Sequence, residues 1–154
     1  MINCKPLLMN MDNQDLIPKD KFDLDVTRRL SLATPEQVSV VATSLLEWIA
    51  DINWPVALEL IHILPQFYKE LLPSIELILI NPENDTIWKY WIISQLLIQF
   101  PKESIINLLP IIQEYADSVP NNEDEDDLKK SALDFLDWYN KKENSSITNS
   151  NPTE

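Results

Sequence analysis

The absence of glycine is the feature that most constrains the fold of this 154-residue chain. Glycine supplies the positive-φ positions of hairpin turns and bulges, so we expect a helical protein rather than a hairpin-rich β protein. The same absence excludes three glycine-dependent sites, namely the Walker phosphate loop, the dinucleotide-binding fingerprint and the nucleophile elbow. The sequence therefore favours an all-α fold and excludes several common classes of enzyme site.

The N-terminal part of the chain contains two predicted helices. Phe22, Val26 and Leu30 recur at four-residue spacing, which predicts a short amphipathic helix that caps the fold. Thr34 and Gln37 have the spacing of a capping box, so a second helix is expected to begin directly after Thr34. The expected buried face of this second helix consists of Val38, Val41, Ala42, Leu45 and Ile49.

Prolines divide the rest of the chain. Proline lacks the N–H that would continue a helix, but it fits the first turn of the next one. Pro55 is therefore expected to begin a helix after a break near Asp51. Pro73, Pro82 and Pro101 are expected to delimit later helices in the same way.

An internal repeat determines the expected architecture. Trp54 and Trp88 each follow an acidic residue and are 34 residues apart, and Leu128 follows Trp88 by 40 residues. Two Leu-Leu-Pro motifs, at residues 71–73 and 108–110, are 37 residues apart. Such spacing is typical of two-helix units that stack side by side. The sequence therefore predicts a short α-solenoid of about three antiparallel helix pairs with an N-terminal capping helix.

This pattern resembles the HEAT repeat. In that repeat, a Leu-Leu-Pro-type first helix leads through an acidic turn to a second helix that carries an apolar, a basic and a small residue. Lys89 and Lys129 stand at the basic position, and Ala132 stands at the small one. The first repeat departs from the pattern, with Pro55 and Leu58 at these two positions. The resemblance implies that the helix pairs are HEAT-like.

Five segments of the chain carry a second resemblance: Ile17–Lys21, Leu46–Trp48, Asp51, Asn53–Ala57 and Trp88–Ile93. They are similar to the signature of the mostly bacterial family called domain of unknown function 5071. The resemblance extends over about residues 16–138. It implies a compact helical-repeat domain of about this length and assigns no activity to it.

Weak patterning at both ends sets the expected domain boundaries. We expect a loose N-terminal segment over residues 1–15, a single HEAT-like helical domain over residues 16–140 and a disordered polar tail over residues 141–154. The apolar run after Lys5 is too short for a signal peptide, and the single Cys4 cannot form an internal disulfide. A cytoplasmic location is expected.

The charge balance restricts the expected partners. The chain has 25 Asp and Glu residues against 12 Lys and Arg residues, which gives a net charge of -13. Nucleic acids and anionic membranes are therefore not expected as partners, because their phosphates would be repelled. The longest apolar runs are shorter than the ~20 residues of a membrane-spanning helix. A basic protein is the partner that the charge favours.

His62 is the only histidine, and it follows Glu59 by three residues, a spacing found among di-iron ligands. A di-iron bundle needs two such motifs, and a standard zinc site needs several Cys and His ligands. With one histidine and one cysteine in the chain, we expect no metal and no cofactor. A triad of His62 with a serine and an acid remains open, because triads are recognised by geometry. The expected role of His62 is structural.

Several polar residues are candidates for an interaction surface. The segment 86–100 is apolar on nearly all faces and is expected to be buried, with Trp88 and Trp91 in the core. The segment 19–21 either caps the first helix through Asp20 or forms a functional surface. The acidic run 123–127 either favours a helix start or forms a docking patch. The candidate surface comprises Lys19, Asp20, Lys21, Asp51, Asn53, Asp85, Lys89, Tyr90, Glu123, Asp124, Asp126 and Asp127.

The motifs and charge together favour a non-enzymatic protein-interaction module that binds a basic protein, with no catalytic or cofactor-binding residue. One alternative is an immunity or regulatory protein that neutralises a cationic toxin. A second alternative is an enzyme whose dispersed site lies near the inter-helix turns. The residues of that site would be Asp51, Asn53, Asp85, Lys89 and Tyr90.

Overall fold

The structure is a computed structural model that describes the backbone of residues 12–149 and the side chains of residues 12–141. Helices are the only regular elements in this part of the chain, which confirms the predicted all-α class. None of these helices has the length and apolar content that crossing a membrane requires. The helical segments are η1 (Asn13–Leu16), α2 (Val26–Ser31), α3 (Pro35–Glu47), α4 (Pro55–Ile63), η2 (Leu64–Phe67), α5 (Tyr68–Ile80), α6 (Thr86–Trp91), the π-helix η3 (Ile92–Leu96), η4 (Leu97–Gln99), η5 (Lys102–Leu108), α7 (Leu109–Ala116) and α8 (Glu123–Asn149).

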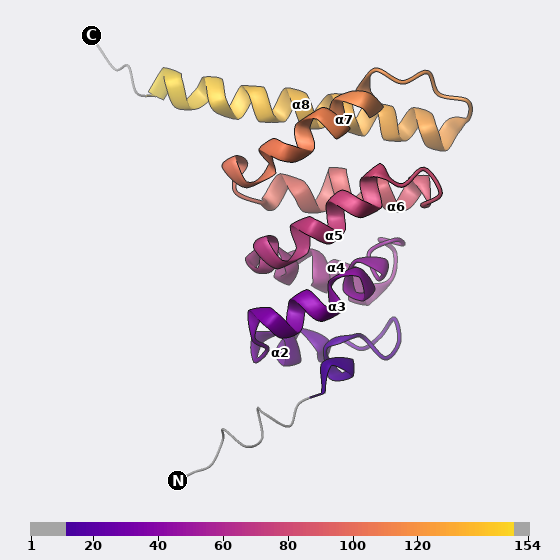
Figure 1. The fold of residues 1–154 in the computed structure, drawn as a ribbon, viewed down its shortest axis with the longest axis vertical. Coiled ribbons are helices and arrows are strands. Elements are labelled where there is room, and N and C mark those ends of the chain that lie inside the picture. Colours follow the sequence, from indigo (N-terminus) through magenta and orange to yellow (C-terminus); the bar gives the residue numbers. More distant parts are fainter. Residues whose placement is uncertain (1–11, 150–154) are drawn as a thin grey trace.

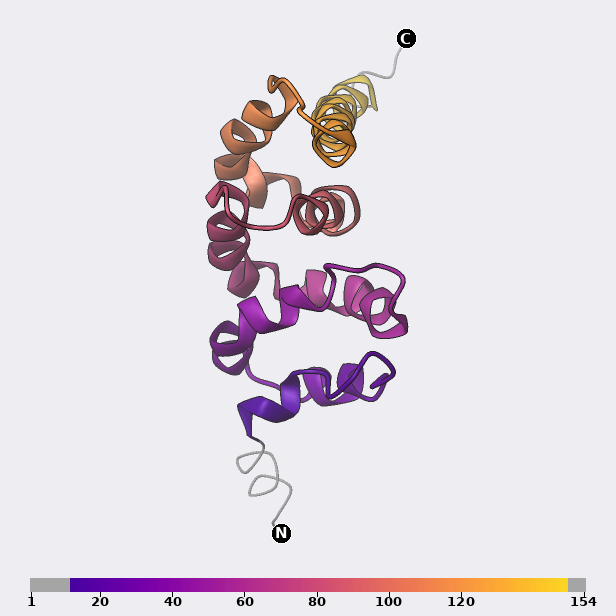
Figure 2. The same cartoon turned by 90° about the vertical axis from the view of Figure 1, so that its right-hand side faces the viewer.

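The α-helices lie in two columns along the long axis of the molecule (Figure 1, Figure 2). One column consists of α3, α5 and α7, and the other consists of α2, α4, α6 and α8. Successive helices therefore alternate between the columns, and their apolar side chains form one core cluster. At one end η1 contacts α3, and at the other end α8 packs against α6 and α7.

The start of α3 is the predicted capping box. The Thr34 hydroxyl accepts a hydrogen bond from the Gln37 backbone N–H at 3.2 Å, and the Gln37 side-chain oxygen accepts one from the Thr34 backbone N–H at 3.0 Å. Both bonds satisfy N–H groups at the helix start that would otherwise lack partners. The predicted buried face is confirmed for Val38, Val41, Ala42 and Leu45, whereas Ile49 is buried but follows the end of α3 at Glu47, earlier than the predicted break near Asp51.

The first predicted helix is shorter than the sequence indicated. Phe22 was expected on its apolar face, but it is 67% exposed and precedes α2. The physical reason is a turn in which the Asp20 carboxylate accepts a hydrogen bond from the Phe22 backbone N–H at 2.8 Å. Asp20 therefore stabilises a turn and is not the cap of α2, whose N-cap residue is Asp25. Val26 and Leu30 are buried as predicted.

Of the prolines expected to delimit helices, Pro73 is the exception. Pro55 begins α4, Pro82 lies in the connection after α5, and Pro101 is the N-cap residue of η5, as predicted. Pro73 lies inside α5, so the expectation of a helix boundary there is wrong. Because Pro73 and Lys69 are both exposed, water can replace the backbone hydrogen bond that the proline removes from the Lys69 carbonyl.

The helical region extends beyond the predicted boundaries at both ends. At the start, Asp12 caps η1 by accepting a hydrogen bond from the Gln14 backbone N–H at 3.3 Å, and Leu16 is fully buried. At the other end, α8 continues past residue 140 to Asn149. The structure therefore places residues 13–15 and 141–149 in helices. Residues 1–11, which include Cys4, and residues 150–154 lie outside the described residues.

The segment 86–100 is central but not one continuous helix. It consists of α6, the π-helix η3 and the short η4. Its buried apolar residues, Ile92, Ile93, Leu96 and Leu97, confirm the predicted central position. A π-helix has more residues per turn than an α-helix, so it changes the directions of the side chains that follow. The prediction that Trp88 and Trp91 lie in the core is wrong, because both residues are partly exposed. Of the two, Trp88 packs against the core from its edge.

Side-chain hydrogen bonds join helices that are about one repeat apart. The Trp88 indole N–H donates to the Leu46 carbonyl at 2.8 Å, across 42 residues of sequence. The Tyr115 hydroxyl donates to the Leu79 carbonyl, across 36 residues. Each bond satisfies a carbonyl near the end of a helix in the neighbouring layer. These bonds fix the positions of α6 and α7 relative to α3 and α5.

Candidate functional site

Two clefts adjoin α6 and α8 and contain several of the predicted surface residues. The first, which we term the aromatic cleft, encloses about 460 Å³. It lies between the α6–η4 segment and one face of α8. Its polar and aromatic lining consists of Tyr90, Ser94, Asp127, Lys130, Ser131, Asp134, Phe135 and Trp138.

Spacing along α8 explains why its contribution to the aromatic cleft lies on one side. Residues 127, 130, 134 and 138 recur at three- and four-residue intervals, which places them on one helical face. The Trp138 ring packs against the Phe135 ring, with 5.4 Å between their centroids. On the α6 side, Tyr90 packs against the core and contacts Trp91 edge-on at 4.7 Å. Aromatic side chains thus stand on both walls of the cleft.

The carboxylates give the aromatic cleft its charge. Lys130 is the one cation in the lining, and its ammonium pairs with Asp126 at 2.9 Å. This hydrogen bond with Asp126 raises the pKa of Lys130. Among the described residues, neither Asp127 nor Asp134 forms an ion pair. Two unpaired carboxylates beside aromatic rings form an environment that attracts a cation.

Ser94 adds an unusual polar group to this cleft. Its hydroxyl oxygen is buried and has no hydrogen-bond partner, and it is the one such side-chain atom in the described part of the chain. Ser94 belongs to the π-helix η3, and π-helical turns occur frequently at functional sites. Buried hydroxyl groups are usually hydrogen-bonded, so the unsatisfied Ser94 hydroxyl is an exception inside the wall of this cleft.

The second cleft, which we term the lysine cleft, encloses about 560 Å³ between the ends of α5, α6 and α7 and the start of α8. Leucine and isoleucine side chains form much of its wall. The residues that give it chemical character are Lys89, Glu114, Tyr115, Ser118 and Glu125.

Lys89 is the one buried charged residue among the described residues, with 4% exposure. Its ammonium lies 5.4 Å from the centroid of the Tyr115 ring. Burial lowers the pKa of Lys89, because the charged form loses hydration. Burial also raises the pKa of Tyr115, and the nearby negative charge of Glu114 raises it further. Lys89 was predicted to lie on an interaction surface, but the structure places it in the wall of a cleft.

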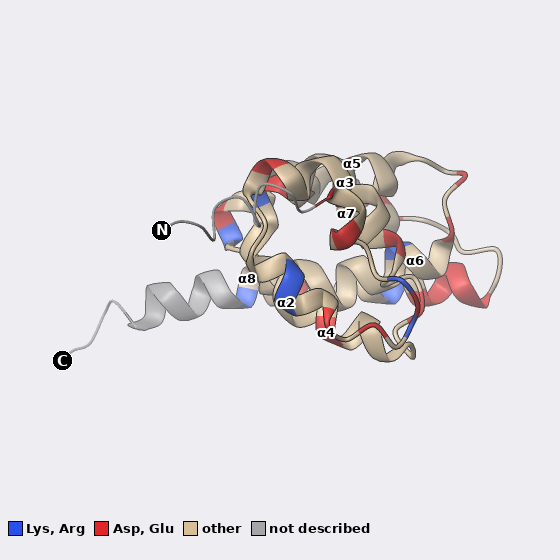
Figure 3. Cartoon of the chain, turned by 90° about the horizontal axis from the view of Figure 1, so that it is seen from below, with Lys and Arg blue, Asp and Glu red and all other residues tan. Residues whose placement is uncertain are grey.

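The acidic run at the start of α8 does not form one patch. Figure 3 shows these residues beside α6. Glu123 and Asp124 are exposed, whereas Asp126 pairs with Lys130 and Asp127 lines the aromatic cleft. Glu125 accepts a hydrogen bond from the Asn121 backbone N–H at 2.8 Å. The run therefore places negative charge at the start of α8, where it is favourable, and also contributes Asp127 and Glu125 to the two clefts.

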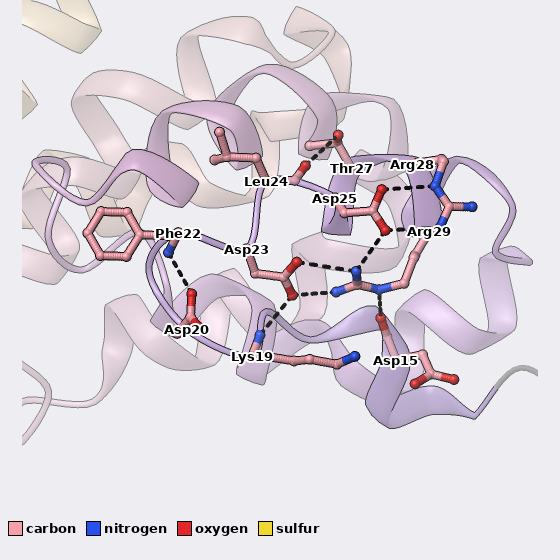
Figure 4. Close-up of polar contacts among 10 residues, drawn as sticks. All are labelled: Asp15, Lys19, Asp20, Phe22, Asp23, Leu24, Asp25, Thr27, Arg28 and Arg29. Atoms are coloured by element: carbon pink, nitrogen blue, oxygen red, sulfur yellow. Dashed lines mark hydrogen bonds and ion pairs between the residues drawn. The ribbon is translucent and has the colours of Figure 1, made fainter.

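The predicted segment 19–21 is part of a network of backbone contacts (Figure 4). The Lys19 backbone N–H donates to the Asp23 carboxylate at 2.9 Å. The Lys21 carbonyl accepts a hydrogen bond from the Val56 backbone N–H in the first turn of α4 at 3.0 Å. The Lys21 ammonium lies over the Phe22 ring, 5.4 Å from its centroid. Segment 19–21 therefore stabilises a turn rather than capping α2, and its three side chains are exposed.

Arg29 is the centre of that network, and the sequence analysis did not identify it. Its guanidinium donates hydrogen bonds to the Asp23 carboxylate and the Asp15 carbonyl, and it also contacts Asp25 (Figure 4). The hydrogen bond from Arg29 holds the pKa of Asp23 below 3.8, although burial partly opposes this effect. Arg29 thereby joins η1, the turn before α2 and α2 itself.

The residues of the alternative enzyme site do not come together. Lys89 lines the lysine cleft, while Tyr90 lines the aromatic cleft. Asp51 accepts a hydrogen bond from the Asn53 backbone N–H at 3.0 Å, and Asp85 accepts one from the Ile87 backbone N–H at the start of α6. The three residues at the turns therefore have local structural roles.

His62 and the acidic residues show no metal-binding arrangement in the described part of the chain. His62 is exposed, and its Nδ1 lies 2.7 Å from the Leu58 carbonyl on the same helix. No group of three or more His, Cys, Asp or Glu residues there could hold a metal ion.

Sequence reasoning missed several residues of the two clefts. Asp134 and Trp138 could have been found, because they follow Asp127 at helical spacing on the predicted last helix. Ser94 and Tyr115 could not, because their environments depend on the π-helix and on contacts between layers. Such contacts have no local sequence signal.

The comparisons with known proteins concern the whole helical domain. No curated protein matches the chain. The family model described as a domain of unknown function (DUF5071) matches residues 16–136. This range includes the lining of the lysine cleft and all the named lining of the aromatic cleft except Trp138. The match confirms the resemblance seen in the sequence, and the chain therefore belongs to the DUF5071 family.

Proposed function

We propose that this chain is a protein-interaction module whose aromatic cleft receives a cationic side chain of a basic partner protein. The proposal is carried by the arrangement of Tyr90 and Trp138 with Asp127 and Asp134 around one cleft. A lysine or arginine side chain satisfies both sets of groups, because its stem contacts the rings and its charge pairs with a carboxylate.

The scaffold for this module is, in our proposal, a short HEAT-like solenoid. Three observations support it: the two columns of alternating helices (Figure 2), the predicted repeat of 34 to 40 residues, and the hydrogen bonds between layers. The bonds of Trp88 and Tyr115 span 42 and 36 residues, close to one repeat. Stacked helix pairs of this kind present extended surfaces for binding polypeptides.

The net charge of -13 supports a basic partner. A strongly negative molecule attracts basic proteins at long range and raises their rate of association. The aromatic cleft would then provide the specific contact after this non-specific approach. The long-range attraction and the local contact are separable, because charges outside the cleft contribute only to the former.

Comparative affinity capture from native cells, followed by mass spectrometry, tests this proposal. The baits are the native protein, the cleft variant Asp127→Asn/Asp134→Asn and the control variant Glu123→Gln/Asp124→Gln. Both variants remove two negative charges from α8, but Glu123 and Asp124 do not line the cleft. We expect a basic protein to be recovered by the native and control baits and about tenfold less by the cleft variant. Equal recovery by all three baits, or an acidic partner, would contradict the proposal.

A further inference from the structure

Lys89 is a buried cation without a counter-ion. Its ammonium forms no ion pair and donates no hydrogen bond among the residues that the structure describes, and its one charge-related contact is the face of the Tyr115 ring. A buried ammonium normally has a carboxylate or several hydrogen-bond acceptors, because it gives up strong hydration. Even the partly buried Lys129 donates two hydrogen bonds, to the Ala116 and Ser118 carbonyls at 2.8 and 2.7 Å.

The location of Lys89 indicates what could supply the missing counter-ion. The residue lines the lysine cleft, so a molecule that enters the cleft would lie beside the Lys89 side chain. A carboxylate is the anion that would pair with it most simply. The same cleft, however, is lined by Glu114 and Glu125, which would repel a ligand that carries only negative charge.

A ligand with one negative and one positive group fits both features. Its carboxylate would pair with Lys89, and its ammonium would face Glu114 or Glu125. The body of the ligand would contact the apolar wall, which includes Leu79, Ile111 and Leu128. A volume of about 560 Å³ is within the range of small-molecule sites.

We propose that the lysine cleft binds a small zwitterion, specifically an α-amino acid with an aliphatic side chain, whose carboxylate is the counter-ion of Lys89. This inference concerns a different cleft from the proposed protein-binding site and does not depend on it. Lowering of the Lys89 pKa by burial agrees with it, because a bound carboxylate would restore a favourable environment for the ammonium.

Isothermal titration calorimetry with L-leucine and two analogues tests the proposal. The analogue 4-methylpentanoate keeps the carboxylate without the ammonium, and 3-methylbutylamine keeps the ammonium without the carboxylate. We expect saturable binding of L-leucine, and binding of each analogue weaker by about tenfold or more, because each lacks one charged contact. Equal affinity for leucine and either analogue, or no saturable binding of leucine, would overturn the proposal.

Substitution of Lys89 tests whether its ammonium binds the carboxylate of the ligand. Lys89→Met retains most of the apolar stem but removes the ammonium, so leucine binding should be lost. Lys69→Met is the matched control, because the Lys69 ammonium also lies over an aromatic ring, that of Tyr68, but outside the cleft. Leucine binding that survives in Lys89→Met, or is lost equally in Lys69→Met, would refute the role of Lys89.

Two further measurements keep the result independent of folding defects. Since removal of an unpaired buried charge should not destabilise the fold, Lys89→Met should unfold at the same or a higher denaturant concentration than the native protein. The double variant Glu114→Gln/Glu125→Gln should weaken leucine binding about tenfold while leaving or improving the binding of 4-methylpentanoate. If both ligands weaken equally in that variant, the ammonium contact is absent and the zwitterion assignment is wrong.

Discussion

Arg29 illustrates, at the residue scale, how one side chain connects several elements. It holds the Asp23 carboxylate and the Asp15 carbonyl, and both partners of the Arg29–Asp23 ion pair are largely buried. Because the hydrogen bond from Arg29 lowers the pKa of Asp23, the folded state keeps this carboxylate charged at pH values where the unfolded chain is protonated. The stabilising contribution is therefore complete well above pH 3.8 and is lost as the pH falls through the lower folded pKa.

Asp23→Asn should reduce the free energy of unfolding near neutral pH, because the ion pair with Arg29 is lost. The free energy of unfolding of this variant should also fall less than that of the native protein as the pH is lowered, because residue 23 no longer titrates. Urea unfolding followed by circular dichroism at several pH values measures both effects. Asp20→Asn is the control, because an amide oxygen can still accept the hydrogen bond from the Phe22 backbone N–H. If the native protein and Asp23→Asn lose stability in parallel as the pH falls, the ion pair does not contribute as described.

The contrast between Thr34 and Arg29 shows what can be predicted from sequence at this scale. The capping box of Thr34 and Gln37 spans three residues, so its spacing alone identified it. The bond between Arg29 and the Asp15 carbonyl depends on how η1 returns to α2. Such a contact depends on tertiary structure. Several aspartates lie near Arg29 in the sequence, and their spacing does not predict which of them pairs with it.

Trp88 and Trp91 should differ in their effects on stability. Both residues are partly exposed, but only Trp88 packs against the core and donates a hydrogen bond to the Leu46 carbonyl. Trp88→Ala should reduce the free energy of unfolding by about 3 kcal/mol, the lower end of the cost of removing a large aromatic side chain from a core, because Trp88 is partly buried. Trp91→Ala should cost clearly less. Denaturant unfolding of the two variants measures the difference, and equal losses would contradict the assigned environments.

At the scale of elements, α5 tolerates a proline that the sequence analysis interpreted as a boundary. Pro73 is exposed and deprives the Lys69 carbonyl of its helical partner. Pro73→Ala should restore that hydrogen bond and raise the free energy of unfolding by about 1 to 2 kcal/mol, since greater freedom of the unfolded chain offsets part of the gain. Thermal unfolding tests this prediction. A lower midpoint for Pro73→Ala would show that the proline shapes α5 in a required way.

Helix starts could be predicted from residue spacing, whereas the π-helix and the clefts depend on tertiary packing. The sequence correctly located the starts of α3 and α4, because capping residues and proline act locally. It could not predict the π-helix η3, because the apolar residues of segment 86–100 are compatible with several helical periods. The candidate sites also depend on packing that the sequence does not reveal. Tyr90 and Asp127 were identified as polar surface residues, but only the packing of α6 on α8 places them in one cleft.

At the scale of the whole molecule, the negative charge should control how fast a basic partner binds. Exposed charges are screened over about 8 Å at physiological ionic strength, so added salt should slow association more than it changes dissociation. Stopped-flow mixing of the captured partner with the native protein at low and high salt measures both rates. Charge reversal of Glu123 and Asp124, which are exposed and lie outside the aromatic cleft, should weaken the salt dependence. An association rate that does not change with salt would exclude electrostatic steering.

An NMR titration of the protein with N-acetyl-arginine amide and its uncharged analogue N-acetyl-citrulline amide tests directly whether the aromatic cleft recognises a cationic side chain. We expect the arginine compound to shift the resonances of Tyr90 and the Trp138 indole, and the citrulline compound to do so at least about tenfold more weakly. Asp127→Asn/Asp134→Asn should abolish the difference. Equal shifts with arginine and citrulline, or an unchanged response in the variant, would contradict recognition of a cationic side chain by this cleft.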